Sequence, residues 1–299
     1  MPRMRFALPF LFVASFLAHA QDLATLTAEQ VKTDCNDDCP DTAIIFIHGI
    51  TGDRTTWLNT TTQSYFPSMI ASEDPVQSEA DVYRVDYISD KLSGPSVDSI
   101  LKVMNAKLDE LIEKKDYIKV IFVAHSLGGI MARSYFLHVK TSYGHQALSR
   151  IRLLITLGTP TDGSSLTKIA EYASSNQQLR VLREIDVNDF SQLLNRSVDE
   201  FTAKHRDCKT IFNFAAFEQY PEPVIGMVVK PESATGRGSA TGVRGFNKTH
   251  SELSKPPDKQ DLLYRWTSSL INRCIEDDPA VCPLKYKGGP ICGTGDYPL

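Results

Sequence analysis

Short, fully apolar runs alternate with longer segments of helical periodicity along most of the chain. Ala43–Ile47 is one such run, and continuous apolar character is typical of a strand buried on both faces of a sheet. Val97–Glu113 instead carries apolar side chains at helical spacing. Strands that alternate with helices predict an α/β fold with a mostly parallel central sheet flanked by helices. By the same criteria we predict strands over Val82–Tyr87, Ile118–Ala124, Ile151–Leu157, Thr210–Phe217 and Val224–Val229, and helices over Leu127–Val139 and Lys259–Ile271.

Three segments depart from this alternation. Residues 21–41 are polar, and we expect an irregular leader there, followed by one α/β domain over residues 42–273. Residues 160–208 interrupt the domain with amphipathic helical segments, which form either a cap over the strand ends or a helical crossover on one face. Residues 274–299 are rich in proline, glycine and cysteine and are expected to form a cysteine-stapled tail.

The first twenty residues have the layout of a secretory signal peptide. Arg3 and Arg5 form a basic start, an apolar run covers residues 6–17, and Ala18-His19-Ala20 is a small-x-small cleavage site. The alternative is a membrane anchor, but the run is shorter than the roughly 20 residues that a spanning helix needs. We therefore expect residues 1–20 to be a signal peptide that directs export of the protein to the periplasm or the extracellular space.

Composition and charge exclude several classes of protein. The chain has 299 residues, of which 42% are hydrophobic and 23% are charged, and this balance argues against disorder. The net charge is −4 without a long basic block, which argues against a dedicated nucleic-acid binder.

The six cysteines are expected to form disulfides, because export places them in an oxidising space. Cys35 and Cys39 are close enough in sequence to pair with each other. The remaining four leave the pairing open, because six cysteines allow 15 connectivities. A zinc site is the rival interpretation, but the single C-x-x-x-C has no matching pair of histidines, so neither a metal nor another cofactor is expected. The other cysteines are Cys208, Cys274, Cys282 and Cys292.

The clearest chemical motif is the sequence VAHSLGG at residues 123–129. A serine hydroxyl is a weak nucleophile, so catalysis needs it exposed on a sharp turn and held against a base. Ala124 and Gly128 are the small residues that such a turn requires around Ser126. The helix that follows directs its free N–H groups, beginning with that of Leu127, toward a developing oxyanion. This is the nucleophile-elbow pattern G-x-S-x-G, with alanine at the first glycine.

A second turn lies upstream, in the sequence FIHGITG at residues 46–52. It ends the first strong strand, where a backbone N–H group of Ile50 or Thr51 can supply the second oxyanion donor. Gly49 permits the close approach that this donor needs, and we expect His48 to have a structural role.

With both turns in place, the chain resembles the α/β-hydrolase superfamily, and more narrowly the lipase-like serine esterases related to GPI-inositol deacylases and SERAC-type proteins. The resemblance covers residues 43 to about 272 and rests on IFIHGITGDRTTW, VAHSLGGIMAR and LITLGTPTDGS, together with AAFEQ and the stretch from VVKPESATG to KTHSELSKP. It implies an α/β-hydrolase fold. Ala124, the long Gly/Ser/Arg loop before the last histidine and the cysteine-rich tail depart from the family pattern.

The resemblance also implies the chain order serine, acid, histidine. His250 lies after the last predicted strand and before the final helix, where the catalytic base should be. His205 is the runner-up, but its neighbours Lys204 and Arg206 disfavour the protonated ring and leave it a poorly supported base.

The acid that orients the histidine should follow a strand between Ser126 and His250. Glu218 closes the strand predicted over Thr210–Phe217 and is our choice. Glu222 and Glu232 are close rivals. Asp186 and Asp189 are less favoured, because they fall within the helical insert.

Substrate contacts are less well defined by the sequence. Thr159 and Ser164 follow a strand end and are candidates to line the site. Arg237 and Arg244 lie in the loop before His250, where they can contact an anionic head group such as a phospholipid phosphate, or can simply be solvated.

These residues together predict a secreted serine hydrolase that cleaves carboxylic esters through a Ser-His-Glu triad and an acyl-enzyme. The substrate is expected to be a lipid or a small acyl ester, with transient contact to a membrane surface in the first case. An acyltransferase that uses the same triad and an inert α/β-hydrolase scaffold that acts as a binding module are the alternatives.

Overall fold

A seven-stranded sheet forms the centre of the protein, with the strand order β1-β3-β2-β4-β5-β6-β7. This computed structural model describes residues 23–32, 39–49, 52–87, 97–160, 211–223, 226–234 and 240–282. All neighbouring strands are parallel except the edge pair β1–β3. The strands are β1 (Ala24–Gln30), β2 (Thr42–Ile47), β3 (Ala80–Tyr87), β4 (Lys119–His125), β5 (Ile151–Leu157), β6 (Phe212–Glu218) and β7 (Gly242–Phe246).

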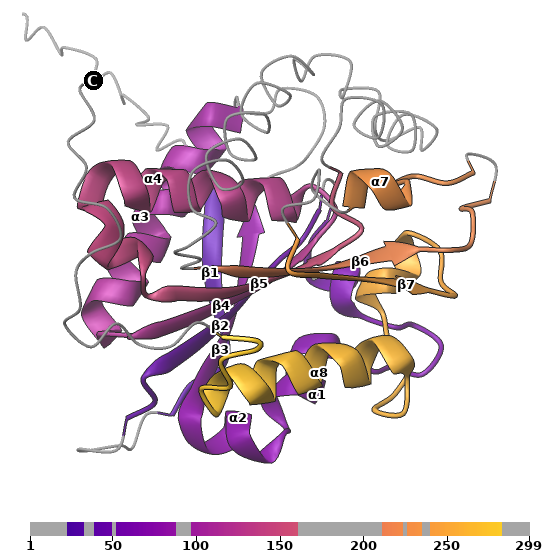
Figure 1. Ribbon diagram of the computed structural model, residues 1–299, viewed down its shortest axis with the longest axis horizontal. Coiled ribbons are helices and arrows are strands. Elements are labelled where there is room, and N and C mark those ends of the chain that lie inside the picture. Colours follow the sequence, from indigo (N-terminus) through magenta and orange to yellow (C-terminus); the bar gives the residue numbers. More distant parts are fainter. Residues whose placement is uncertain are drawn as a thin grey trace, which may run out of the picture.

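Helices cover both faces of the sheet (Figure 1). One face packs against α3 (Val97–Lys115), α4 (Gly128–Leu148) and the short α7 (Pro231–Ala234). The other packs against α1 (Phe66–Ala71), α2 (Asp74–Glu79) and α8 (Leu262–Ile275), together with the 3-10 turns η1 (Arg54–Trp57) and η3 (Ser251–Ser254). Because both faces are covered, the central strands β2, β4 and β5 are buried throughout, which explains their continuous apolar sequences.

The register of the strands brings four of their carboxyl ends to one edge of the sheet. Ile47 pairs with Ala124, His125 with Leu157, and Leu157 with Ala216. Ligands of open α/β sheets bind outside the carboxyl ends of the strands. This edge is therefore the place to look for the chemistry.

The structure confirms the predicted fold class and most of the predicted elements, and it corrects three of them. Residues 24–30 are not irregular but form β1, which pairs antiparallel with β3. The loop before His250 contains the edge strand β7. The strand predicted over Val224–Val229 is wrong in its described part, where Gly226 forms an isolated bridge and the N–H groups of Val228 and Val229 donate to Glu218.

Two disulfides reach into the described residues. Cys274, near the end of α8, is bonded to Cys282. Cys39 is also disulfide-bonded. The cysteines that lie outside the described residues are Cys35, Cys208 and Cys292. The tail after residue 282, the signal peptide and residues 161–208 of the insert lie outside them as well.

A buried lysine fastens the end of α8 to the start of β4. Lys119 Nζ donates to the carbonyl oxygens of Cys274 and Ile275 at 2.9 and 2.8 Å, and it pairs with Asp277 at 2.7 Å. The last carbonyl groups of a helix have no partner within the helix, and they carry its negative dipole end, so a cation is well placed there. Across the described parts of the chain, no helix combines the length and apolar character needed to cross a bilayer.

Candidate active site

Ser126 lies in the turn between β4 and α4, with a backbone φ of 54°. Three other non-glycine residues with positive φ, Gln63, Asp116 and Asp277, are exposed in the described structure, whereas Ser126 is buried. A non-glycine residue in this region costs free energy and persists only where its surroundings enforce it. The sharp strand-to-helix turn expected of a nucleophile elbow is therefore present.

Two hydrogen bonds from β5 and the residues after it hold this turn. The Ser126 N–H donates to the carbonyl oxygen of Leu157 at 2.8 Å, and Thr159 Oγ1 donates to the Ser126 carbonyl oxygen at 2.9 Å. Thr159, which we expected to line the substrate site, is 1% exposed, so its contact is with the elbow itself.

The glycines around the elbow are required by close approach. A Cβ atom on Gly128 would lie 2.3 Å from the carbonyl oxygen of Ile47, and one on Gly49 would lie 2.7 Å from Ser126 Cβ. A Cβ on Gly129 would lie 2.2 Å from Thr159 Oγ1. The first turn of α4 thus passes too close to the ends of β2 and β5 for any larger residue.

His250 lies against the end of β5, beside the strand that carries Ser126. A Cβ atom on Gly158, which has a φ of 62°, would lie 2.9 Å from Nδ1 and Cε1 of His250. Gly158 directly follows Leu157, the residue whose carbonyl oxygen accepts the Ser126 N–H. The buried imidazole therefore lies at the same edge of the sheet as the serine.

Glu218, the last residue of β6, is the acid that the structure brings to His250. Its Oε2 lies 3.5 Å from His250 Nδ1, and the side chain is fully buried. Its Oε1 accepts the N–H groups of Val228 and Val229 at 3.1 and 2.5 Å. Burial favours the neutral carboxyl group, but His250 and the Val229 N–H group outweigh it and hold the pKa of Glu218 below its usual value. Glu218 is therefore an ionised carboxylate at neutral pH.

The rival acids do not occupy this position. Glu222 is buried, but its Oε1 accepts the N–H of Ser251 at 2.6 Å. Glu232 is exposed on α7. Asp186, Asp189 and His205 lie outside the described residues.

Of the three residues expected to supply oxyanion donors, the structure describes one. Leu127 opens the turn into α4, so its N–H group lies beside Ser126 at the positive end of the helix dipole. Ile50 and Thr51 lie outside the described residues. Of the described residues on either side of them, Gly52 donates its N–H to the Gly49 carbonyl oxygen at 3.2 Å.

His48 has the structural contacts expected of it. Its Nδ1–H donates to the Gly49 carbonyl oxygen at 2.7 Å, and its Nε2 accepts the Tyr87 N–H at 3.2 Å. The rings of His48 and Tyr87 stack with their centroids 4.2 Å apart. Burial lowers the pKa of His48 to about 4, so the ring is neutral and can keep both bonds.

Of the predicted head-group residues, the structure describes only Arg244. Arg244 is exposed in the middle of β7, and its guanidinium lies 5.3 Å from the ring centroid of Phe246. Phe246 packs on Trp266 of α8, so Arg244 shares the α8 face of the sheet. Ser164 and Arg237 lie outside the described residues.

One contact at this site has no counterpart in the sequence motifs. The Nε2–H of His125, a residue of the elbow motif, donates to the carbonyl oxygen of His250 at 3.0 Å. The two residues are 125 positions apart, and no local pattern indicates this contact.

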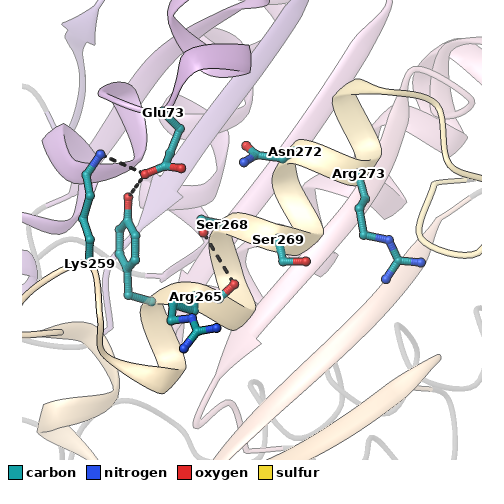
Figure 2. A pocket seen from close by; sticks show the side chains of 8 residues that line it. Glu73, Lys259, Arg265, Ser268, Ser269, Asn272 and Arg273 are labelled. Carbon is teal, nitrogen blue, oxygen red and sulfur yellow. Dashed lines mark hydrogen bonds and ion pairs between the residues drawn. The ribbon is translucent and has the colours of Figure 1, made fainter.

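A groove of about 530 Å³ runs along α8 beside Glu73. Figure 2 shows the side chains that line it. Glu73 accepts hydrogen bonds there from Tyr264 and Lys259 at 2.6 and 2.9 Å. None of the residues that line this groove belongs to the strand ends and turns that carry Ser126, Glu218 and His250. Within the described residues, no group of three or more His, Cys, Asp and Glu side chains is arranged to hold a metal ion.

Comparisons with known proteins bear on the family and the fold of the chain. The model of the PGAP1-like alpha/beta domain matches residues 39–191. A search of curated proteins finds no match. Among solved structures, a lipase from Bacillus licheniformis in mature form is 19% identical, with a TM-score of 0.52 over 84% of this chain and 98% of that one. An α/β-hydrolase superfamily protein from Enterococcus faecalis is 14% identical, with a TM-score of 0.52 over 85% and 95%.

Because the sequence identities are low, the similarity to these solved structures shows a shared fold and nothing more. The family match covers slightly more than half of the chain, including the turn at residues 46–52 and the nucleophile elbow. The fold and the family model together confirm the resemblance found in the sequence: the chain belongs to the family of PGAP1-like alpha/beta domains and has the α/β-hydrolase fold.

Proposed function

We propose that the protein is a secreted serine hydrolase that cleaves carboxylic esters through Ser126, His250 and Glu218. One observation carries the proposal: a serine in the left-handed backbone region shares a sheet edge with a buried imidazole–carboxylate pair. Strained nucleophile turns of this kind present a serine to its base in α/β-hydrolases.

The mechanism follows from the position of each group. Ser126 Oγ attacks the acyl carbonyl carbon while His250 Nε2 takes its proton, and the carbonyl π electrons move onto the oxygen. The N–H of Leu127, with that of Ile50 or Thr51, stabilises this oxyanion. The C–O bond then breaks, and His250 returns the proton to the departing alcohol. Water, deprotonated by His250, hydrolyses the acyl-enzyme and restores Ser126.

Glu218 serves the two steps in which His250 is charged. Its carboxylate faces Nδ1, so it favours the tautomer that leaves Nε2 free to accept a proton. Because the pair is buried, the attraction between carboxylate and imidazolium is stronger than it would be in water. The backbone N–H groups of Val228 and Val229 keep the carboxylate in this orientation.

Two further observations support the substrate class and the compartment. Structures with this fold include a lipase from Bacillus licheniformis and, at a TM-score of 0.50, an esterase from Pyrococcus furiosus. The Cys274–Cys282 disulfide and the bonded Cys39 fit an oxidising compartment, as does the sequence of residues 1–20.

Labelling with a fluorophosphonate probe tests this proposal directly. The purified oxidised protein should be labelled, while Ser126→Ala and His250→Ala should not. Ser134→Ala is the matched control, because Ser134 lies on α4 with its Oγ bonded to the Ile130 carbonyl oxygen and should not affect labelling. Hydrolysis of p-nitrophenyl esters of increasing chain length would then define the acyl preference. Folded wild-type protein that neither takes up the probe nor cleaves any ester would refute the proposal in favour of a binding scaffold.

A further inference from the structure

The peptide unit that joins His250 to Ser251 is held by side chains at both of its polar atoms. Its carbonyl oxygen accepts the Nε2–H of His125 at 3.0 Å. Its N–H group donates to Glu222 Oε1 at 2.6 Å. Both side chains are 8% exposed, so water competes little for either bond.

From this geometry we propose that His125 and Glu222 are positioning residues that clamp the backbone of the catalytic histidine and thereby set the distance between His250 and Ser126. The inference rests on the proposed function, because it concerns the placement of the base relative to the nucleophile. Neither residue is expected to touch the substrate.

His125 suits this role because of its place in the chain. It is the last residue of β4 and directly precedes Ser126. A bond from its ring to the His250 carbonyl therefore ties the turn of the base to the strand of the nucleophile. The centroids of the two imidazoles lie 5.0 Å apart, and Trp57 packs edge-on against His125 with centroids 6.4 Å apart.

The tautomer of His125 is set by its partners. Nε2 must carry the proton in order to donate to a carbonyl oxygen, and the buried Nδ1 has no hydrogen-bond partner among the described residues. Burial, followed by the proximity of His250, lowers the pKa of His125, so the neutral ring is the stable form. His125 therefore acts as a fixed donor and not as a second base.

Glu222 holds the same peptide unit from the other side. Its own backbone is fixed by a bridge in which the N–H groups of Glu222 and Gly226 each donate to the other's carbonyl oxygen at 3.0 Å. An ionised carboxylate forms a strong bond to a backbone N–H. Glu222 was a rival for the catalytic acid, and the clamp gives its buried carboxylate a different task.

Paired variants separate positioning from a merely structural role. His125→Phe keeps a planar ring and removes the donor, whereas His125→Gln keeps an N–H group at a similar reach. We expect His125→Phe to lower kcat for a p-nitrophenyl ester by about 10- to 100-fold with KM within twofold, because small misplacements of a catalytic group have effects of this size. His125→Gln should recover most of the lost rate.

The Glu222 series repeats the test from the other side. Glu222→Leu should lower kcat by about 10-fold or more, while Glu222→Gln, which keeps an acceptor oxygen, should recover most of it. Glu222→Asp keeps the charge but withdraws the carboxylate from Ser251, so it should also be slow. Glu232→Leu, at an exposed position of α7, is the matched control and should keep the wild-type rate.

Because both side chains act on one peptide unit, the His125→Phe/Glu222→Leu double variant should lose less rate than the product of the single losses. Urea unfolding identifies variants that fail to fold. If His125→Phe or Glu222→Leu is among them, the kcat values of His125→Gln and Glu222→Asp test the clamp instead. Folded His125→Phe or Glu222→Asp with wild-type kcat would overturn the clamp, as would a loss confined to KM. Wild-type protein that takes no fluorophosphonate would instead refute the proposed function, so the two failures are distinguishable.

Discussion

Ser126 and His250 share one edge of the sheet, but different kinds of contact hold them there. Ser126 belongs to a continuous segment, in which β4, a two-residue turn and α4 follow one another. His250 lies in a turn between β7 and η3, and its partners come from β4, β6 and the segment after β6. The turn of the nucleophile thus forms within one continuous segment and packs against backbone atoms of neighbouring strands, whereas the base is held by side chains from segments far apart in the sequence.

This difference explains where each half of the site tolerates change. The elbow is constrained by backbone atoms, since a Cβ on Gly128 would meet the carbonyl oxygens of Ile47 and His48. The base is constrained by side chains, so single substitutions there can shift it without unfolding the sheet. Substitution of Ser126 removes the nucleophile itself, whereas substitutions at Glu218 and Gly158 disturb the contacts that hold the base.

Removing the nucleophile should have the largest effect. We expect Ser126→Ala to lower kcat by about 10⁶-fold, because the oxyanion donors and substrate binding alone leave only residual catalysis. The thermal midpoint should stay close to that of the wild type, since the hydroxyl makes no hydrogen bond to the rest of the described structure. Steady-state kinetics and calorimetry would check both, and substantial activity in Ser126→Ala would move the nucleophile elsewhere.

Neutralising the acid should have the next largest effect. Glu218→Gln keeps an oxygen for the N–H groups of Val228 and Val229 but places an amide opposite His250 Nδ1. This favours the wrong tautomer, so we expect kcat to fall by about 10⁴-fold. Glu232→Gln is the matched control and should behave as wild type in the same ester assay. Equal rates for wild type and Glu218→Gln would remove Glu218 from the triad.

A methyl group at Gly158 should displace the base while leaving the elbow in place. The Cβ of Gly158→Ala would lie 2.9 Å from the His250 ring, and we expect kcat to fall by about 100-fold. Gly144→Ala is the control for backbone strain alone, because Gly144 has a φ of 79° but no described residue has an atom within 4 Å of the new Cβ. Both variants should lose about 1 kcal/mol of stability from the strained φ, and only Gly158→Ala should lose rate. Equal kcat values for the two variants would contradict the placement of His250.

The ionised state of Glu218 should appear in the pH dependence of stability. Its pKa lies below the usual value of 4.5 in the folded protein, so it stabilises the fold above that value, and this stability is lost as the pH falls through the folded pKa. Urea unfolding of wild type and Glu218→Gln should therefore show a difference in unfolding free energy that shrinks on acidification below pH 4.5. A difference that grows toward low pH would mean that the buried carboxyl group is neutral.

The smallest effect is expected at Arg244, which shares the α8 face with Phe246. Arg244→Glu should change kcat and KM for neutral esters and for anionic phospholipids by less than about twofold, because an exposed charge is screened by solvent and salt. A selective loss of phospholipid turnover would restore Arg244 as a head-group contact.

Local sequence patterns were enough for the central part of the molecule. The apolar runs of β2, β4 and β5 indicate strands buried on both faces, and the VAHSLGG motif identifies Ser126 because strand, turn and helix are consecutive. Such patterns were not enough for the outermost strands of the sheet. β1 and β7 are half-exposed strands without a continuous apolar run, so neither was predicted. Val228 and Val229 are apolar and buried, which imitates a strand, although their N–H groups bind Glu218.

What the sequence by itself determined is the α/β class, the elbow at Ser126 and, through the family order, the choice of Glu218 and His250. Those features depend on neighbours in the chain or on chain order alone. Only the tertiary structure decided that Thr159 supports the elbow, that Arg244 lies on the α8 face, and that His125 and Glu222 hold the peptide after His250. These contacts join residues tens of positions apart, and which polar groups meet depends on how the strands are ordered and packed.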